Sequence, residues 1–168
     1  MERLWSPWRH RYVTRDEQPS DGCVFCQVDG PDAEALVLHR GVAAYVILNL
    51  YPYNGGHTMV VPVRHVATMA GLRDEELVEI ARLTRLTEMA LTEVYRPQGM
   101  NVGLNLGRPA GAGVVDHLHV HLVPRWTGDT NFMPVIGETR VLPETLDSTA
   151  ARVRPVLARL VAETGAEP

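Results

Sequence analysis

Three histidines alternate with aliphatic residues in Val115–Arg125, which reads Val-Asp-His-Leu-His-Val-His-Leu-Val-Pro-Arg. This period of two is typical of a half-buried β-strand, which we expect to span residues 116–123. His117, His119 and His121 then share one face, with rings about 6 to 7 Å apart, while the aliphatic residues point into a core. At least one ring should be neutral or metal-bound, because three charged imidazoles would repel one another.

Such a row of imidazoles has three interpretations. It is a surface strand that carries histidines, although three of the chain's seven histidines fall in this one segment. It is a catalytic metal site, since closely spaced histidines are common zinc ligands. Or it is a group of phosphate-handling residues with a nucleophilic imidazole among them.

Other residue types exclude several covalent mechanisms. All sixteen basic residues are arginine, so no lysine is present for a Walker-type phosphate loop, a Schiff base or a nucleotidyl-lysine intermediate. The three serines, Ser6, Ser20 and Ser148, stand outside any Gly-x-Ser-x-Gly motif of a serine hydrolase. Covalent chemistry would therefore depend on histidine or cysteine.

The length and composition indicate one globular domain. The chain has 168 residues and a net charge of −4, which argues against a general nucleic-acid binder. Its N-terminus lacks the apolar core of a signal peptide, and no segment approaches the ~20 apolar residues of a membrane span. We therefore expect a cytoplasmic protein with no membrane partner. We divide it into an N-terminal arm rich in tryptophan and arginine (1–21), a core (22–125) and a C-terminal extension with a helix (126–168).

Apolar periodicity predicts the elements that position the histidines. The expected strands cover residues 41–50, 57–62, 101–106 and 116–123. The expected helices cover Asp74 to about Tyr95 and Arg152–Glu163. A turn is expected at 51–56 and a glycine-rich loop at 107–113. Since no βαβ unit repeats, these elements indicate an α+β domain with an antiparallel sheet, one long helix and one C-terminal helix.

Cys23 and Cys26 form a Cys-x-x-Cys motif, which alone is ambiguous between redox chemistry, zinc binding and chance. In a reducing compartment, a metal or redox role is favoured over a structural disulfide. A thioredoxin-like site is disfavoured, because no strand precedes the motif as that fold requires.

The pattern His-φ-His-φ-His-φ-φ at His117–Val123 resembles the histidine-triad family of nucleotide hydrolases and transferases. The resemblance runs from about Gly22 to Arg125 and includes a second motif, Gly56–His65, in the right order. Residues 48–54 and 101–107 look most like the bacterial branch that contains diadenosine tetraphosphate phosphorylases. The resemblance implies the histidine-triad fold, a homodimer with one continuous sheet, and cleavage of dinucleoside polyphosphates.

The resemblance also implies a structural zinc site. In the family and its uridylyltransferase relatives, a cysteine pair binds zinc with the histidine of a Pro-x-x-His motif and the first triad histidine. The matching residues here are Cys23, Cys26, His65 and His117. Two thiolates and two imidazoles leave no open coordination position for water, so this zinc would be structural and not catalytic.

Site roles follow from the same resemblance. The middle triad histidine, His119, is the expected nucleophile, and His121 and His57 are expected to donate to phosphate oxygens. The residues expected to bind substrate are Val24, Phe25, Ile47 and Leu50 around the nucleoside, Asn49 near the ribose, and Asn105 and Gly113 near the phosphates. The family more often has aspartate at the position of Asn49, which leaves the sugar preference open.

The acceptor of the nucleotidyl group is expected to be inorganic phosphate or water. Hydrolytic family members usually carry glutamine or a hydroxyl residue shortly before the triad, but here Ala112-Gly113-Val114 stands in those places. Exposed N–H groups of the glycine-rich loop, beside Arg108, could hold a phosphate. Two other functions stay open: a module that senses nucleotides without turnover, and a zinc-dependent hydrolase with metal on the three triad histidines.

Overall fold

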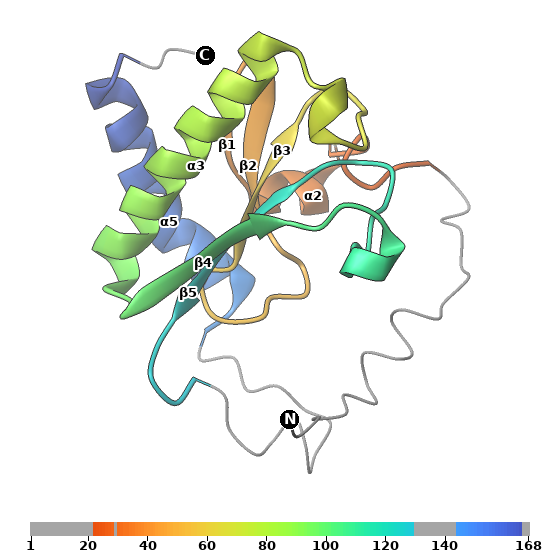
Figure 1. The fold of residues 1–168 in the computed structure, drawn as a ribbon. Coiled ribbons are helices and arrows are strands. Elements are labelled where there is room, and N and C mark those ends of the chain that lie inside the picture. Colours follow the sequence, from red (N-terminus) through yellow and green to blue (C-terminus); the bar gives the residue numbers. More distant parts are fainter. Residues whose placement is uncertain (1–21, 29, 130–143, 166–168) are drawn as a thin grey trace, which may run out of the picture.

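The structure, a computed structural model, describes residues 22–28, 30–129 and 144–165, so the N-terminal arm and most of 126–143 lie outside the described residues. Five antiparallel strands form one sheet with the order β1-β2-β3-β5-β4 (Figure 1). The strands are β1 (Val37–Arg40), β2 (Ala44–Leu48), β3 (Thr58–Pro62), β4 (Gly99–Leu104) and β5 (Val120–Arg125). The α-helices are α2 (Pro31–Leu36), α3 (Asp74–Tyr95) and α5 (Leu146–Glu163). Short 3-10 turns are Met69–Gly71 and Arg108–Ala110.

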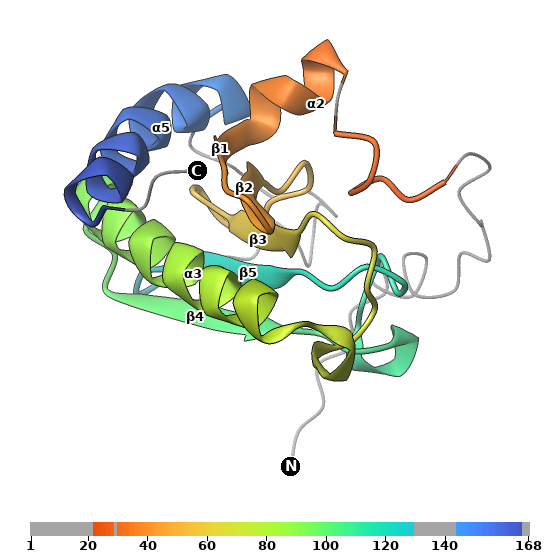
Figure 2. The same cartoon turned by 90° about the horizontal axis from the view of Figure 1, so that it is seen from above.

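Helices α3 and α5 pack together over one face of the sheet, as Figure 2 shows from above. Their apolar residues and those of β2, β3 and β5 form the larger core. Leu118, Val120 and Leu122 belong to this core, which confirms that the aliphatic residues of the triad segment point inward. None of the helices in the described parts of the chain is long and apolar enough to span a bilayer.

The other face of the sheet carries a smaller apolar cluster and the histidines. This cluster contains Phe25, Val28, Val37, Tyr45, Ile47, Met59 and Val61. The Tyr45 hydroxyl donates to the carbonyl of Phe25 at 2.7 Å and so holds the Cys23–Cys26 segment against β2. His121 pairs with Met59 across β3 and β5, which places the last triad histidine on this same face.

The predicted class, an α+β domain with an antiparallel sheet, is confirmed. The long helix has the predicted bounds, and at its start the Glu76 carboxylate accepts from the Arg73 N–H at 2.8 Å. The C-terminal helix begins earlier than predicted, at Leu146, where the Thr145 hydroxyl accepts from the Ser148 N–H. The elements α2 and β1 were not predicted, because their apolar residues are too few to show a period.

The predicted triad strand at 116–123 was wrong at its start, since β5 begins at Val120 and only His121 lies within it. The neighbouring strand β3 ends at Pro62, which has no N–H to continue the ladder. The Leu118 N–H instead donates to the Val66 carbonyl at 2.7 Å. His117 and His119 therefore lie on an extended segment whose course is set by these contacts and not by strand pairing.

Candidate active site and metal cluster

The loop between β2 and β3 places His57 at the centre of the site. Gly56 has φ +79°, and a Cβ atom there would lie 2.9 Å from the Tyr95 ring, so the turn requires glycine. The His57 N–H then donates to the Asn54 carbonyl at 3.2 Å, and the His57 carbonyl accepts from Asn49 at 3.0 Å. His57 is thereby fully buried at the start of β3.

Backbone geometry fixes the tautomer of His57. The Tyr53 N–H lies 3.0 Å from Nδ1 of His57, and a backbone amide can only donate, so Nδ1 must be the acceptor. The proton of the neutral ring is then on Nε2, which lies 2.9 Å from Nδ1 of His121. The Asn49 amide nitrogen, 3.4 Å from the same Nε2, is also a donor, so that approach is not a hydrogen bond.

His121 therefore accepts at Nδ1 and carries its own proton on Nε2. Burial, and next the positive charge that His119 can carry, lower the pKa of His121 to about 4. The ring is neutral near pH 7 and has one N–H donor to offer a phosphate oxygen. The rings of His119 and His121 meet edge to face with centroids 4.8 Å apart, closer than the predicted 6 to 7 Å.

His119 has the opposite arrangement of ring nitrogens. Its Nδ1 lies 2.8 Å from the backbone carbonyl of His117, which can only accept, so Nδ1 carries the proton. Burial lowers the pKa of His119, which keeps the ring neutral, although the bond to the carbonyl opposes this shift. The lone pair is then on Nε2. Phe25 packs against the ring with centroids 5.0 Å apart and fixes its plane.

A second cluster, formed by Cys23, Cys26, His65 and His117, has side-chain ligand atoms that all lie within 4.8 Å of one another. Nδ1 of His117 is 3.2 Å from Sγ of Cys23 and 3.5 Å from Sγ of Cys26, and Nδ1 of His65 is 3.4 Å from Sγ of Cys26. Tetrahedral zinc, with bonds of ~2.3 Å to sulfur and ~2.0 Å to nitrogen, holds these atoms about 3.5 Å apart. These four residues could hold a metal ion.

Two further contacts support this metal cluster. Nε2 of His117 donates to the Pro62 carbonyl at 2.8 Å, which leaves Nδ1 to face the sulfur atoms. Beside His65, the Arg64 guanidinium binds both oxygens of Glu76 at 2.8 and 2.6 Å, and these hydrogen bonds, with that from the Arg73 N–H, lower the pKa of the carboxyl to about 2. The loop that carries His65 is thus held to the start of α3.

The glycine-rich loop differs from the expectation. The N–H groups of Ala110, Gly111 and Ala112 donate to carbonyls of Gly107 and Arg108 within the loop. The prediction of N–H groups turned outward to an anion was therefore wrong for these three. A 3-10 turn, which uses its own amides, replaces the open nest.

The residues expected to bind substrate are placed unequally. Phe25 and Ile47 are buried in the smaller apolar cluster, while Val24 and Leu50 are exposed. Asn49 is half-buried and its side-chain oxygen accepts from the Tyr51 N–H at 2.9 Å. Among the described residues, no hydrogen bond or ring contact joins Asn105 or Gly113 to the triad histidines.

The resemblance implied a backbone carbonyl as the acceptor for the second ring nitrogen of His119, and the His117 carbonyl has this place. Sequence reasoning missed the groups opposite the other rings, the Tyr53 amide and the Pro62 carbonyl, because these are backbone atoms that no residue type reveals. It also missed Asp129, whose carboxylate accepts from the Asn54 side chain at 2.8 Å. An Arg-x-x-x-Asp spacing after the triad strand is the weak signal that could have found it.

A family model, the HIT domain, matches residues 31–128. AP-4-A phosphorylase of Mycobacterium tuberculosis is 45% identical to this chain over 157 residues, which cover 89% of the chain and 80% of that protein. A solved Zn-bound histidine triad family protein from Mycobacterium smegmatis aligns with TM-score 0.68 and 28% identity, over 84% of this chain and 97% of that one.

A hypothetical histidine triad nucleotide-binding protein from Sulfolobus tokodaii aligns with TM-score 0.70 and 27% identity, over 85% of this chain and 97% of that one. The matches thus include the domain that carries the triad histidines, and the solved relatives have the same fold. From the family model and the identity to the mycobacterial protein, this chain belongs to the HIT (histidine triad) family.

Proposed function

We propose that the protein is an enzyme that cleaves dinucleoside polyphosphates, of the diadenosine tetraphosphate type, through a nucleotidyl-histidine on His119. The observation that carries this proposal is the 2.8 Å contact of His119 Nδ1 with the His117 carbonyl. It leaves the other ring nitrogen as a nucleophile at neutral pH. The 45% identity to a protein named AP-4-A phosphorylase supports this substrate class.

In the first step, Nε2 of His119 attacks the α-phosphorus, a P–N bond forms, and the P–O bond to the nucleoside triphosphate breaks. The imidazole becomes positively charged, and its Nδ1–H bond to the His117 carbonyl stabilises that charge. The Nε2–H of His121 donates to a phosphate oxygen on which negative charge develops. His57 fixes the ring of His121 through the 2.9 Å contact.

In the second step, an oxygen of the acceptor attacks the same phosphorus and the P–N bond breaks. We propose inorganic phosphate as this acceptor, which yields ADP and ATP from diadenosine tetraphosphate. The support is the absence of a water-orienting side chain at Ala112-Gly113-Val114, together with the relative's name. Three N–H groups of the glycine-rich loop, those of Ala110, Gly111 and Ala112, donate within the loop and so do not support phosphate binding there.

The test is product analysis on diadenosine tetraphosphate in phosphate buffer and in phosphate-free buffer. Phosphorolysis gives ADP and ATP, and only when phosphate is present. AMP and ATP at equal rates in both buffers would establish hydrolysis instead. Binding without any product would establish the sensing module.

We propose that the metal of the second cluster is zinc and that its role is structural. The support is the donor set of two thiols and two imidazoles, with sulfur–nitrogen separations near those of a tetrahedral site. Zinc there would tie the Cys23–Cys26 segment, which carries Phe25, to the triad. In the reducing cytoplasm, where we propose that the protein works, both thiols stay available.

A homodimer is the third part of the proposal. Strand β4 is an edge of the sheet, and its exposed Val102 and the following Leu106 are apolar. An unprotected edge of this kind can pair with another strand. Light scattering coupled to size exclusion should give twice the chain mass, and a single chain mass at micromolar concentration would contradict it.

A further inference from the structure

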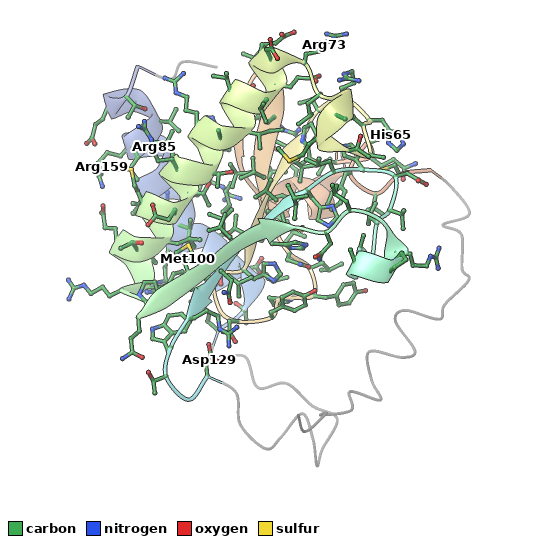
Figure 3. All side chains as sticks on the ribbon, in the orientation of Figure 1. His65, Arg73, Arg85, Met100, Asp129 and Arg159 are labelled. Atoms are coloured by element: carbon green, nitrogen blue, oxygen red, sulfur yellow. The ribbon has the colours of Figure 1, made fainter. Side chains whose placement is uncertain are left out.

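Arg125 and Asp129 form an ion pair just after β5. Nε and Nη2 of Arg125 lie 2.6 and 2.8 Å from the two carboxylate oxygens, and the Trp126 N–H donates to one of them at 3.1 Å. The hydrogen bonds that Arg125 donates are the main reason that the pKa of Asp129 is far below its usual range. Figure 3 shows Asp129 beyond the strand end, on the opposite side of the molecule from His65.

Asn54 joins this ion pair to the loop before β3. Its side-chain amide donates to Asp129 at 2.8 Å and to the Pro124 carbonyl at 3.0 Å, so both of its N–H groups are used. Its backbone carbonyl accepts from the His57 N–H at 3.2 Å. Asn54 thus joins the end of β5, through its side chain, to His57, through its backbone carbonyl.

Tyr53, the residue before Asn54, contacts His57 directly. Its N–H is the donor to His57 Nδ1 at 3.0 Å, and a displacement of about 1 Å would exceed hydrogen-bond range. Its ring also packs on His57, with centroids 4.7 Å apart. If the amide moved, His57 could take up the other tautomer and present Nδ1–H, with no proton left on Nε2 for His121.

We propose that Asp129 is a positioning residue for catalysis: through Asn54 it holds the Tyr53 amide on His57, and so keeps the His121 proton on the nitrogen that faces the phosphates. This role rests on the proposed function, because His121 matters only if a phosphate oxygen needs its proton. Asp129 itself acts only through Asn54 and the histidine pair.

The experiment combines ring-nitrogen NMR with steady-state kinetics on the zinc-loaded full chain. Long-range ¹H–¹⁵N correlation spectra identify which nitrogen of each histidine is protonated. In the wild type, Nε2 should be protonated on both His57 and His121 at pH 7. In Asp129→Asn and Asn54→Ala, we expect mixed tautomers on both rings and kcat lower by at least about tenfold, with KM within about threefold.

Glu79→Gln is the matched control. Glu79 accepts from the N–H groups of Val42 and Ala43 and so anchors the turn at the opposite end of β2 by a carboxylate. This variant should keep the wild-type tautomers and kcat. Circular dichroism and zinc content establish that each variant is folded. If Asn54→Ala is unfolded, the test rests on Asp129→Asn, which keeps the shape of the side chain.

Folded variants with wild-type tautomers, or with altered tautomers and wild-type kcat, would overturn the inference. The proposed function fails separately, if the wild type yields no product from diadenosine tetraphosphate. In that case the NMR spectra still show whether Asp129 controls the histidine pair.

Discussion

The two ends of the histidine row use the same ring in opposite ways. At the end proposed to bind metal, His117 turns Nδ1 to the two sulfur atoms and donates through Nε2 to a carbonyl. At the end proposed to be catalytic, His121 accepts at Nδ1 from His57 and presents Nε2–H. Between them, His119 donates through Nδ1 and keeps a lone pair on Nε2. Three identical side chains thus have three hydrogen-bonding arrangements, and the difference lies in the group opposite each Nδ1.

Each end also has its own arginine–carboxylate pair. Arg64 and Glu76 hold the loop of His65 to α3, and Arg125 with Asp129 holds the loop of His57 to β5. Both pairs are bidentate, which fixes orientation as well as distance. We therefore expect substitutions near His117 and the cysteines to change metal content and stability, and substitutions near His57 and His121 to change turnover.

The largest expected effect is that of His119→Ala. Activity on diadenosine tetraphosphate should fall by at least about three orders of magnitude, because the covalent route disappears. Nucleotide binding, zinc content and melting temperature should stay close to wild type. Rapid-quench kinetics measures the activity and calorimetric titration measures nucleotide binding. A variant that keeps a tenth of the wild-type rate would show that His119 is not the nucleophile.

The next effect is that of His121→Asn, which loses the donor to the phosphate oxygen. We expect kcat to fall by about a hundredfold with little change in KM, since the interaction strengthens only in the transition state. A kcat close to that of the wild type would mean that no phosphate oxygen needs this proton.

Cys26→Ser tests the metal end. Zinc content should fall below half an equivalent and the melting temperature should drop by roughly 6 to 12 °C, as expected for a loss of about 3 kcal/mol in a chain of this size. Turnover per folded, zinc-loaded molecule should stay near wild type. Metal analysis and thermal unfolding measure the change, and wild-type protein purified without chelator but lacking metal would contradict the assignment.

The most gradual effect is a dependence of stability on pH. The folded pKa of His121 is about 4, below its ordinary value of 6.5, so an unfolded chain takes up this proton first. The free energy of unfolding should therefore fall as the pH drops from 6.5 to 4, by up to about 1.4 kcal/mol per pH unit for this group. Denaturant unfolding at several pH values measures this. In His121→Asn the free energy of unfolding should fall less steeply with decreasing pH than in the wild type, and an equal pH dependence would contradict the prediction.

Much of the fold could be predicted, because its strongest signals are local. The long helix shows its apolar period over many turns, and the hairpin shows two apolar runs around Tyr51–Gly56. The start of the triad strand could not be predicted, since its partner strand β3 ends at Pro62. The short elements α2 and β1 could not be predicted either, because Arg154, distant in the sequence, donates to the carbonyls of Ala35 and Val37 and holds them.

By itself, the sequence determined which residue types could act: no lysine, two cysteines three apart, and three histidines in alternation. Alternation also determined that these rings share a face, because the side-chain period of extended backbone is two. Only the tertiary structure decided what each ring does. A ring nitrogen is a donor or an acceptor according to the group opposite it. Here Nδ1 faces a carbonyl in His119 and a sulfur atom in His117. In His57, which donates to His121, Nδ1 faces the Tyr53 N–H, whose loop is held by Asn54 and Asp129.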